Sequence, residues 1–332
     1  MKEVSLMKSV ICFGEALIDF LNINRFEEQP LWLNEFRQYP GGAPANVAVA
    51  IARLGGKALF AGQVGKDSFG DFLQQSLESY QVDTQLMSRH PQAKTALAFV
   101  MLDEEGDRSF SFFRDNTADM LFDVSQINKD WFLSTGIFHF CSNTLTDDFI
   151  GNTTQYAVTL AKESGVVISF DVNLRHNLWP DGKVDIARVN AFAEQSDVLK
   201  YSHDELIYLA QGDEENYIAT LLKQGVSLIL VTDGANIIHY HCLNECGVIT
   251  PPKVNAIDTT AGGDAFIGAF LFGLSQVSQP KKFLSQAKLF VPLISFSAHC
   301  GAHAVAQQGA FPALPTFADV SSHWQNVQTE QL

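Results

Sequence analysis

Short apolar runs alternate with longer amphipathic segments along most of the 332-residue chain. The apolar runs have the length of buried strands, and the segments between them repeat apolar residues at helical spacing. We expect strands at residues 10–18, 58–63, 137–141, 166–171, 198–201 and 228–232. Helices are expected at 45–54, 69–80, 146–164, 186–195, 204–210, 214–223 and 265–274. This alternation predicts an α/β fold, with a mostly parallel, Rossmann-like sheet covered by helices on both faces.

Two stretches interrupt this alternation. Residues 95–101 and 109–114 have the pattern of an antiparallel hairpin around a turn at 103–107. Residues 20–36 are irregular in pattern and rich in aromatic side chains. We therefore expect residues 1–332 to form a single domain with inserts around 20–40 and 95–114. The inserts would form a small sheet that serves as an active-site lid, a dimer contact or both, although a β-meander extending the main sheet explains the same pattern.

Composition narrows the classes of function. The chain is 46% hydrophobic and 18% charged, which is typical of a soluble globular protein, and its net charge of −15 opposes binding to nucleic acid or an anionic membrane surface. The five cysteines are scattered through mostly apolar runs, as reduced core residues are. The closest pair, Cys242 and Cys246, lies beside the alternating His239 and His241, which favours a strand end over a zinc site. We see no secretory signal or membrane span and expect a cytoplasmic location.

The segment 258–266, Asp-Thr-Thr-Ala-Gly-Gly-Asp-Ala-Phe, carries the strongest chemical signal. Adjacent glycines let backbone N–H groups approach an oxyanion closely, and the N-terminus of the following helix adds roughly half a positive charge. Such a loop suits a phosphoryl group in transfer, with Asp264 placed to accept a proton from an attacking hydroxyl. Taken alone, the motif fits equally well a glycine-rich turn in which Asp264 is an ordinary first-turn residue.

Two N-terminal features fit a polyol ligand. Asp19 follows an apolar run and could accept hydrogen bonds from hydroxyl groups, although a solvated strand terminus is the simpler interpretation. Gly41 and Gly42 precede a helix rich in Ala and Val, so the backbone there could approach a ligand. The side chain of Asn46 can both donate and accept hydrogen bonds, which suits recognition of a hydroxyl group, but Asn46 could also be a capping residue.

Polar residues also follow the later strands. If the chain is extended after residue 170, Asp171, Asn173 and Arg175 lie on the same side of the segment. Arg175 could then bind a phosphate through two hydrogen bonds or form an ion pair with Asp171. Small or hydroxyl-bearing residues at successive strand ends can form a flat surface, here called the shelf, on which a nucleotide could bind. The pattern does not distinguish ATP from another ligand. The shelf residues are Lys200, Ser202, Glu205, Thr232 and Gly234.

Taken together, two motifs resemble the signatures of a known family. Gly-Gly-x-x-x-Asn at 41–46 and Asp-Thr-x-x-x-Gly-Asp at 258–264 occur in the order found in the ribokinase-like, pfkB-type carbohydrate kinases. The chain resembles the bacterial fructokinases most, from about residue 10 to residue 315. The resemblance implies a ribokinase-like fold with a β-sheet lid, a homodimer, ATP as co-substrate, Mg²⁺ and a possible K⁺ ion.

The resemblance also implies roles for single residues. Asp264 would be the catalytic base, and the backbone N–H groups of Ala261, Gly262 and Gly263 would form the anion hole. The substrate-binding positions would be Asp19, Gly41, Gly42, Asn46, Arg114, Asn173 and Arg175. The nucleotide-binding positions would be Lys200, Thr232 and Gly234. Glu205 would help to hold Mg²⁺ through water, and the possible K⁺ site would involve Asp258, Thr260 and Gly309.

The implied activity is ATP-dependent phosphorylation of the primary hydroxyl of D-fructose, giving fructose 6-phosphate. The alternatives are a kinase for 2-keto-3-deoxygluconate or a riboside, and a non-catalytic sugar sensor on the same fold. The chain departs from the commonest family form at two points: Ala261-Gly262 stands in place of Gly-Ala, and Ser202 stands where many relatives carry Asn.

Overall fold

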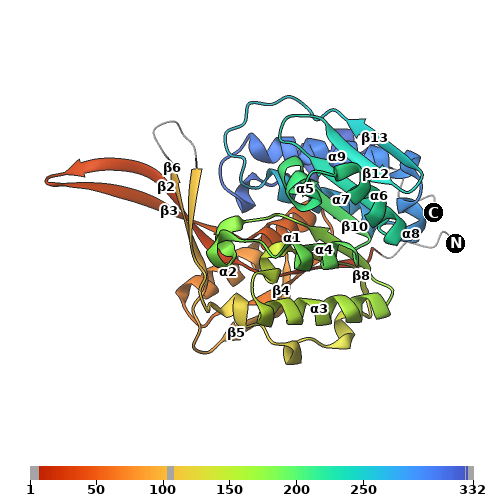
Figure 1. Cartoon of the computed structure of the whole chain (residues 1–332). Coiled ribbons are helices and arrows are strands. Elements are labelled where there is room, and N and C mark those ends of the chain that lie inside the picture. Colours follow the sequence, from red (N-terminus) through yellow and green to blue (C-terminus); the bar gives the residue numbers. More distant parts are fainter. Residues whose placement is uncertain (1–6, 103–107, 326, 328–332) are drawn as a thin grey trace.

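A nine-stranded sheet, the main sheet, runs through the centre of the computed structural model, which describes residues 7–102, 108–325 and 327 (Figure 1). Its strand order is β13-β12-β11-β10-β9-β8-β1-β4-β5. Neighbouring strands from β11 to β5 are parallel, and β12 and β13 add an antiparallel edge. The strands are β1 (Ser9–Phe13), β4 (Ala58–Gly65), β5 (Asp83–His90), β8 (Thr135–Cys141), β9 (Val167–Asp171), β10 (Val198–Ser202), β11 (Leu228–Thr232), β12 (Ile238–Cys242) and β13 (Glu245–Ile249). The predicted fold class is confirmed.

Helices cover both faces of the main sheet because its strands are apolar on both sides. Val10 and Cys12 of β1 belong to one buried cluster with α1, α7 and α9, whereas Ile11 and Phe13 belong to a second with α3, α4, α5 and α6. The helices are α1 (Ala43–Arg53), α2 (Ser68–Ser79), α3 (Asp148–Glu163), α4 (Ile186–Ala193), α5 (His203–Ala210), α6 (Glu214–Gln224), α7 (Gly262–Ser275), α8 (Pro280–Leu284), α9 (Ala287–Val305) and α10 (Phe317–Val320). Because successive side chains of a strand point to opposite faces, each strand contributes to two separate hydrophobic cores.

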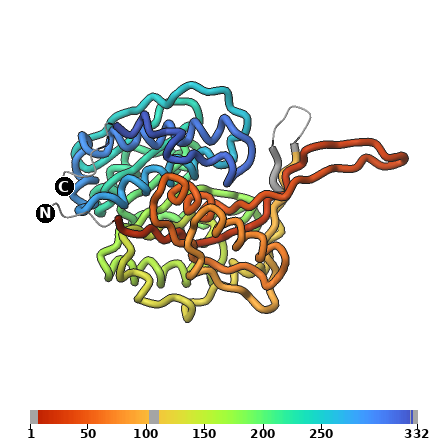
Figure 2. Tube along the Cα trace, turned by 180° about the vertical axis from the view of Figure 1, so that it is seen from behind, coloured from red at the N-terminus to blue at the C-terminus, as the bar shows by residue number. Residues whose placement is uncertain are grey.

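The other strands form a separate sheet, the small sheet, in the order β3-β2-β6-β7. They are β2 (Leu17–Glu28), β3 (Leu31–Gly41), β6 (Leu97–Leu102) and β7 (Arg108–Phe113). The hairpin of β2 and β3 projects from the body as a two-stranded arm, seen from both sides in Figures 1 and 2. These strands do not extend the main sheet as a β-meander would.

Around the inserts, the structure differs from the expected pattern in two details. The strand expected at 10–18 is broken, because β1 ends at Phe13 and the chain leaves the main sheet at Gly14 (φ +143°). Residues 20–36, expected to be irregular, lie in the β2–β3 hairpin, where pairing along almost the whole hairpin outweighs the mixed side-chain pattern. Two of their aromatic rings pack within the small sheet: those of Phe20 and Phe36 contact the ring of Phe99, with centroids 5.0 Å and 5.4 Å away. The expected turn at 103–107 lies outside the described residues.

Several elements differ from the pattern or were missed by it. The edge strand β5 is polar and half-exposed, so it lacks the apolar run of a central strand. Helix α9 was seen only as an apolar stretch, since Pro292 interrupts it. Cys242 and Cys246 belong to the two paired edge strands β12 and β13, and Cys242 ends its strand as expected. In the part of the chain that the structure describes, we find no helix with the length and apolar character needed to span a bilayer.

Candidate active site

A cavity of about 340 Å³ opens where the small sheet meets the C-terminal ends of the central strands. Its walls come from the segment between β1 and β2, the starts of α1 and α7, the end of β7, and the segments after β8 and β9. Residues far apart in the sequence therefore meet at the end of the sheet where ligands of this architecture bind. Of the predicted site residues, the cavity lining includes Asp19, Gly42, Asn46, Arg114, Asn173, Arg175, Thr260 and Asp264.

Asp264 lies in the first turn of α7 and is buried. Its Oδ2 accepts a hydrogen bond of 2.7 Å from Nδ2 of Asn46, which joins the two signature motifs directly. Burial raises the pKa of Asp264 to about 7, while the Asn46 bond acts in the opposite direction. A carboxylate titrating near neutrality, with its second oxygen at a cavity wall, is suited to accept and release a proton.

Asp19 occupies a different place from the one its sequence context predicted. It lies on β2 of the small sheet, paired with Tyr39 and Ala98, rather than at the end of a strand of the main sheet. The chain leaves the main sheet five residues earlier, at Gly14, and this carries Asp19 onto the other wall of the cavity. Burial and the nearby carboxylates of Asp264 and Asp258 raise the pKa of Asp19 to about 7. With Glu15, the cavity is lined by three carboxyl groups.

The glycine pair Gly41-Gly42 allows this close packing. A Cβ on Gly41 would overlap the carboxylate of Asp19. Gly42 has φ +104°, and a Cβ there would lie 2.5 Å from the backbone oxygen of Glu15. Asn46 then follows in the first turn of α1, where its backbone N–H bonds the Gly42 carbonyl and its side chain points to Asp264. The side chain of Asn46 therefore bonds Asp264 rather than capping the helix.

The predicted anion hole lies at the N-terminus of α7. Ala261 precedes the helix at φ −107°, a conformation open to any residue, so an alanine is accommodated at this position. Gly262 is confined by Val305, whose Cγ1 would lie 2.6 Å from an added Cβ. Asp258 fixes the loop from behind, because its carboxylate accepts backbone N–H groups of Thr260 and Gly309 at 2.9 Å each. The N–H groups of Ala261, Gly262 and Gly263 lie at the N-terminus of α7, the positive end of its dipole.

Asn173 and Arg175 follow β9, and Glu205 of α5, which follows β10, contacts their segment. Asn173 takes φ +39°, a region that Asn tolerates better than most residues, and Arg175 is exposed at the cavity rim. Glu205 accepts backbone N–H groups of Leu174 and Ser202 at 2.7 Å each. It thereby closes a capping box with Ser202 and holds the Asn173–Arg175 segment in place. Ser202 thus caps α5.

Three predicted nucleotide residues lie outside the cavity. Lys200 is buried, and its Nζ lies 3.0 Å from Oδ1 of Asp171, so Asp171 pairs with Lys200 and not with Arg175. The same Nζ would lie 3.0 Å from a Cβ on Gly263, which places the ammonium beside the predicted anion hole. Thr232, whose hydroxyl bonds the Tyr201 carbonyl, and Gly234 at φ +51° lie at the end of β11.

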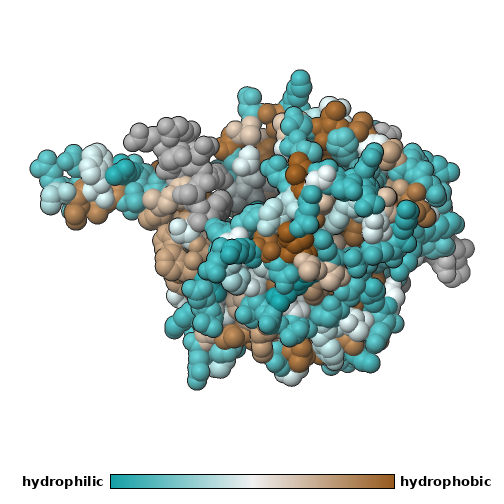
Figure 3. Space-filling model, in the orientation of Figure 1, coloured by the Kyte–Doolittle hydropathy of each residue, from teal (hydrophilic) through white to brown (hydrophobic). Residues whose placement is uncertain are grey.

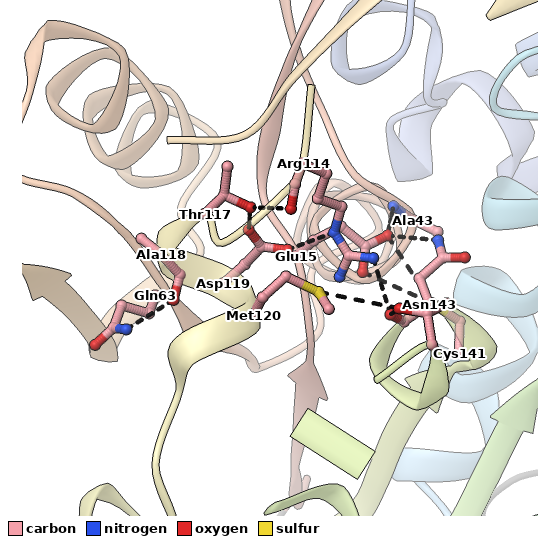
Figure 4. A network of polar contacts seen from close by, with 11 residues as sticks. Glu15, Ala43, Gln63, Arg114, Thr117, Ala118, Asp119, Met120, Cys141 and Asn143 are labelled. Carbon is pink, nitrogen blue, oxygen red and sulfur yellow. Dashed lines mark hydrogen bonds and ion pairs between the residues drawn. The ribbon is translucent and has the colours of Figure 1, made fainter. Parts of the chain in front are cut away.

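Two further polar residues, Glu15 and Asn143, line the cavity although the sequence pattern did not single them out (Figure 4). The buried carboxylate of Glu15 accepts Nδ2 of Asn143 at 2.9 Å and the backbone N–H of Ala43 at 3.2 Å. Arg114 is buried and ion-paired to Asp119 at 2.6 Å. The proximity of Arg114 and Asp119 in the chain was the only available signal, because Asn143 follows a different strand.

A sequence profile described as pfkB family carbohydrate kinase matches residues 7–316. The chain belongs to this family of sugar kinases. It is therefore a phosphotransferase of the ribokinase-like fold.

Individual members of the pfkB family match along nearly the whole chain. A crystal structure of fructokinase with bound ATP from Xylella fastidiosa superposes with a TM-score of 0.90 at 42% identity, covering 96% of this chain and 99% of the other. A fructokinase double mutant from Vibrio cholerae O395, in a form with bound fructose, ADP and potassium ion, superposes with a TM-score of 0.82 at 34% identity, covering 96% and 98%. Probable fructokinase-5 of Arabidopsis thaliana is 38% identical over 93% of this chain and 95% of its own length.

Proposed function

We propose that the protein transfers the γ-phosphoryl group of ATP to the primary hydroxyl of D-fructose, giving ADP and fructose 6-phosphate. The observation that carries the proposal is Asp264, a buried carboxylate at a helix N-terminus, hydrogen-bonded to Asn46 and facing a cavity of sugar size. The fructokinase relatives support fructose over other sugars, since fructose is bound in the structure from Vibrio cholerae.

In the proposed reaction, the hydroxyl proton passes to Asp264 as the sugar oxygen attacks the γ-phosphorus. A new oxygen–phosphorus bond forms, and the bond between the γ-phosphorus and the bridging oxygen breaks, leaving its electron pair on ADP. Asn46 holds one oxygen of Asp264, so that the other is free to face the hydroxyl. The N–H groups of Ala261, Gly262 and Gly263, at the positive end of α7, would stabilise the charge that develops on the transferred group.

The charge of the nucleotide needs local compensation, because the chain carries a net charge of −15. We assign this to the buried Lys200 beside Gly263 and to the exposed Arg175 at the cavity rim. Lys200 lies on β10, which pairs with β11, and Thr232 and Gly234 at the end of β11 would contact the nucleotide. Asp171 holds Lys200 by its ion pair and keeps the ammonium in position.

Mg²⁺ fits the residues present as an ion held mainly by phosphate and water. Both oxygens of Glu205 already accept a backbone N–H, so this carboxylate can bind a water of hydration but is poorly placed as a direct ligand. Among the described residues there is no group of three or more His, Cys, Asp or Glu side chains that could hold a metal ion, in keeping with an ion that arrives with ATP. When bound, Mg²⁺ would neutralise phosphate charge.

A K⁺ ion at the proposed site would be bound more by backbone oxygens than by side chains. A small void of about 20 Å³ is lined by residues that include Asp258, Thr260 and Gly309, the three predicted positions. This space suits one small ion or water. Asp258 already accepts two backbone N–H groups, so a K⁺ ion there would rely mostly on backbone oxygens. K⁺ would add positive charge behind the anion hole.

We also propose a homodimer built through the small sheet and a cytoplasmic location. Ile23, Phe26, Leu31 and Trp32 expose apolar surface on the projecting arm, and Trp32 is 59% exposed (Figure 3). An isolated two-stranded ribbon has little stability in water, so a second copy would cover it. The cysteines are free thiols, four of them buried, which is consistent with a reducing compartment.

A substrate panel tests the proposed activity. Pure protein with ATP and Mg²⁺ should form ADP with D-fructose faster than with 2-keto-3-deoxygluconate or a riboside, and the Asp264→Asn variant should lose this activity while still binding fructose. Equal rates on all the sugars would reject the assignment to fructose. No sugar-dependent ADP formation with any of them, by folded wild-type protein, would favour a sugar sensor.

A further inference from the structure

Arg114, at the end of β7, is a buried cation in the wall of the sugar-side cavity. Its Nε lies 2.6 Å from Oδ2 of Asp119, and its Nη1 donates to the backbone oxygen of Asn143 at 2.9 Å. Thr117 fixes the other oxygen of Asp119, since its hydroxyl lies 2.7 Å from Oδ1. The arginine is therefore held rigidly by its own segment and by the segment after β8 (Figure 4).

Glu15 is a second carboxylate on the same arginine. It is buried beside Asn143, which donates to Glu15 through its side chain and accepts from Arg114 through its backbone. Burial raises the pKa of Glu15, and Arg114 opposes this rise. Burial alone would lower the pKa of Arg114, but Asp119 and Glu15 together raise it. One guanidinium is thus electrostatically coupled to two carboxylates, and the group carries no excess positive charge.

Two polar atoms of this network, both on residues of the cavity wall, have no hydrogen bond within the described part of the protein. Within the described parts of the chain, Nη2 of Arg114 and Oδ1 of Asn143 are buried and have no hydrogen-bond partner. The first is a donor and the second an acceptor, and both residues line the cavity. A sugar hydroxyl can accept from the first atom or donate to the second, whereas a carboxylate can accept from Arg114 but would oppose the oxygen of Asn143.

We propose that Asp119 is a specificity-determining positioning residue, which with Glu15 neutralises Arg114 so that the cavity selects a neutral sugar over a sugar acid. This inference rests on the proposed sugar kinase activity. Asp119 acts through Arg114 and does not itself line the cavity. The cavity lining contains the carboxyl groups of Glu15, Asp19 and Asp264, and its second arginine, Arg175, lies exposed at the rim. A substrate carboxylate that approaches Arg114 therefore meets a guanidinium whose charge Asp119 and Glu15 already offset.

The test is a graded charge series measured on D-fructose and on 2-keto-3-deoxygluconate. With the arginine kept, the local charge is −1 in the wild type, 0 in Asp119→Asn or Glu15→Gln, and +1 in the double variant. We expect the ratio of kcat/KM for fructose to that for the sugar acid to fall about tenfold or more at each step. Asp130→Asn, an exposed aspartate outside the network, should keep the wild-type ratio.

The ratio separates specificity from damage to the fold. An equal fall in kcat/KM for both substrates, with an unchanged ratio, would mean that Asp119 only supports structure and would overturn the proposal. If Asp119→Asn does not fold, Glu15→Gln tests the same electrostatic point, because its amide oxygen can still accept from Ala43. A wild-type preference for the sugar acid would instead reject the assignment to fructose, which is a different outcome from an unchanged ratio in the variants.

Discussion

Replacing Asp264 by Asn should remove activity and, at the same time, stabilise the fold. The side chain is buried, and its pKa rises from 3.8 to about 7 because burial penalises its charged form. A shift of this size corresponds to about 4 kcal/mol. Since Asp19 shares the cavity and titrates over the same range, we expect about 2–4 kcal/mol from Asp264 itself. Loss of the base should lower kcat by about 10²–10⁴-fold.

The pH dependence gives the sign of the stability effect. A carboxyl group with a raised folded-state pKa favours the folded state fully at low pH, and this contribution is lost as the pH rises from about 4 to about 7. The asparagine is neutral throughout and can still accept the hydrogen bond from Asn46. The variant should therefore unfold at a temperature about 3–6 °C above the wild type at pH 8, with less than half of this gap at pH 5.

Thermal unfolding of both proteins at pH 5 and pH 8, with kcat measured on the same samples, checks this reasoning. Asp204→Asn is the matched control, because Asp204 also lies in the first turn of a helix but is exposed. It should show no pH-dependent gain. A gap between Asp264→Asn and the wild type that is absent at pH 8, or equal at both pH values, would refute the view that Asp264 is strained by burial.

Four further outcomes follow from the site. Gly42→Ala should lower the free energy of unfolding by about 2 kcal/mol or more and exceed the effect of Gly55→Ala, as measured by urea unfolding, because both glycines have positive φ but only Gly42 has close neighbours. Asn46→Ala should move the pH profile of kcat/KM upwards by about 0.5–1 unit, since it removes a bond that lowers the pKa of Asp264; a profile that moves down would contradict this. EDTA should abolish turnover without lowering the unfolding temperature, and added Mg²⁺ should restore it. Trp32→Asp should shift sedimentation from dimer to monomer, and an unchanged sedimentation coefficient would count against the arm as the dimer contact.

The sequence predicted most strands of the main sheet well. Buried parallel strands are apolar on both faces, and this leaves a local signal at β4, β8, β9, β10 and β11. The glycine motifs were equally visible, because close backbone approach and a helix start require particular residues at fixed spacing. The expected helix behind Asp264 is α7, which begins at Gly262 rather than at residue 265.

Other features depended on contacts between distant segments. Asp19 looks like a strand-end residue in the sequence, but pairing of β2 with β3 and β6 places it on the small sheet. The partners of Arg114 come from three segments, so their neutralising effect has no local signature. Local sequence thus determined most strands and helices and the glycine-rich loop before α7, because backbone geometry and apolar periodicity are local properties. Tertiary structure alone decided which charges are buried together, and therefore the pKa of Asp264, because desolvation and ion pairing depend on what the folded chain brings near.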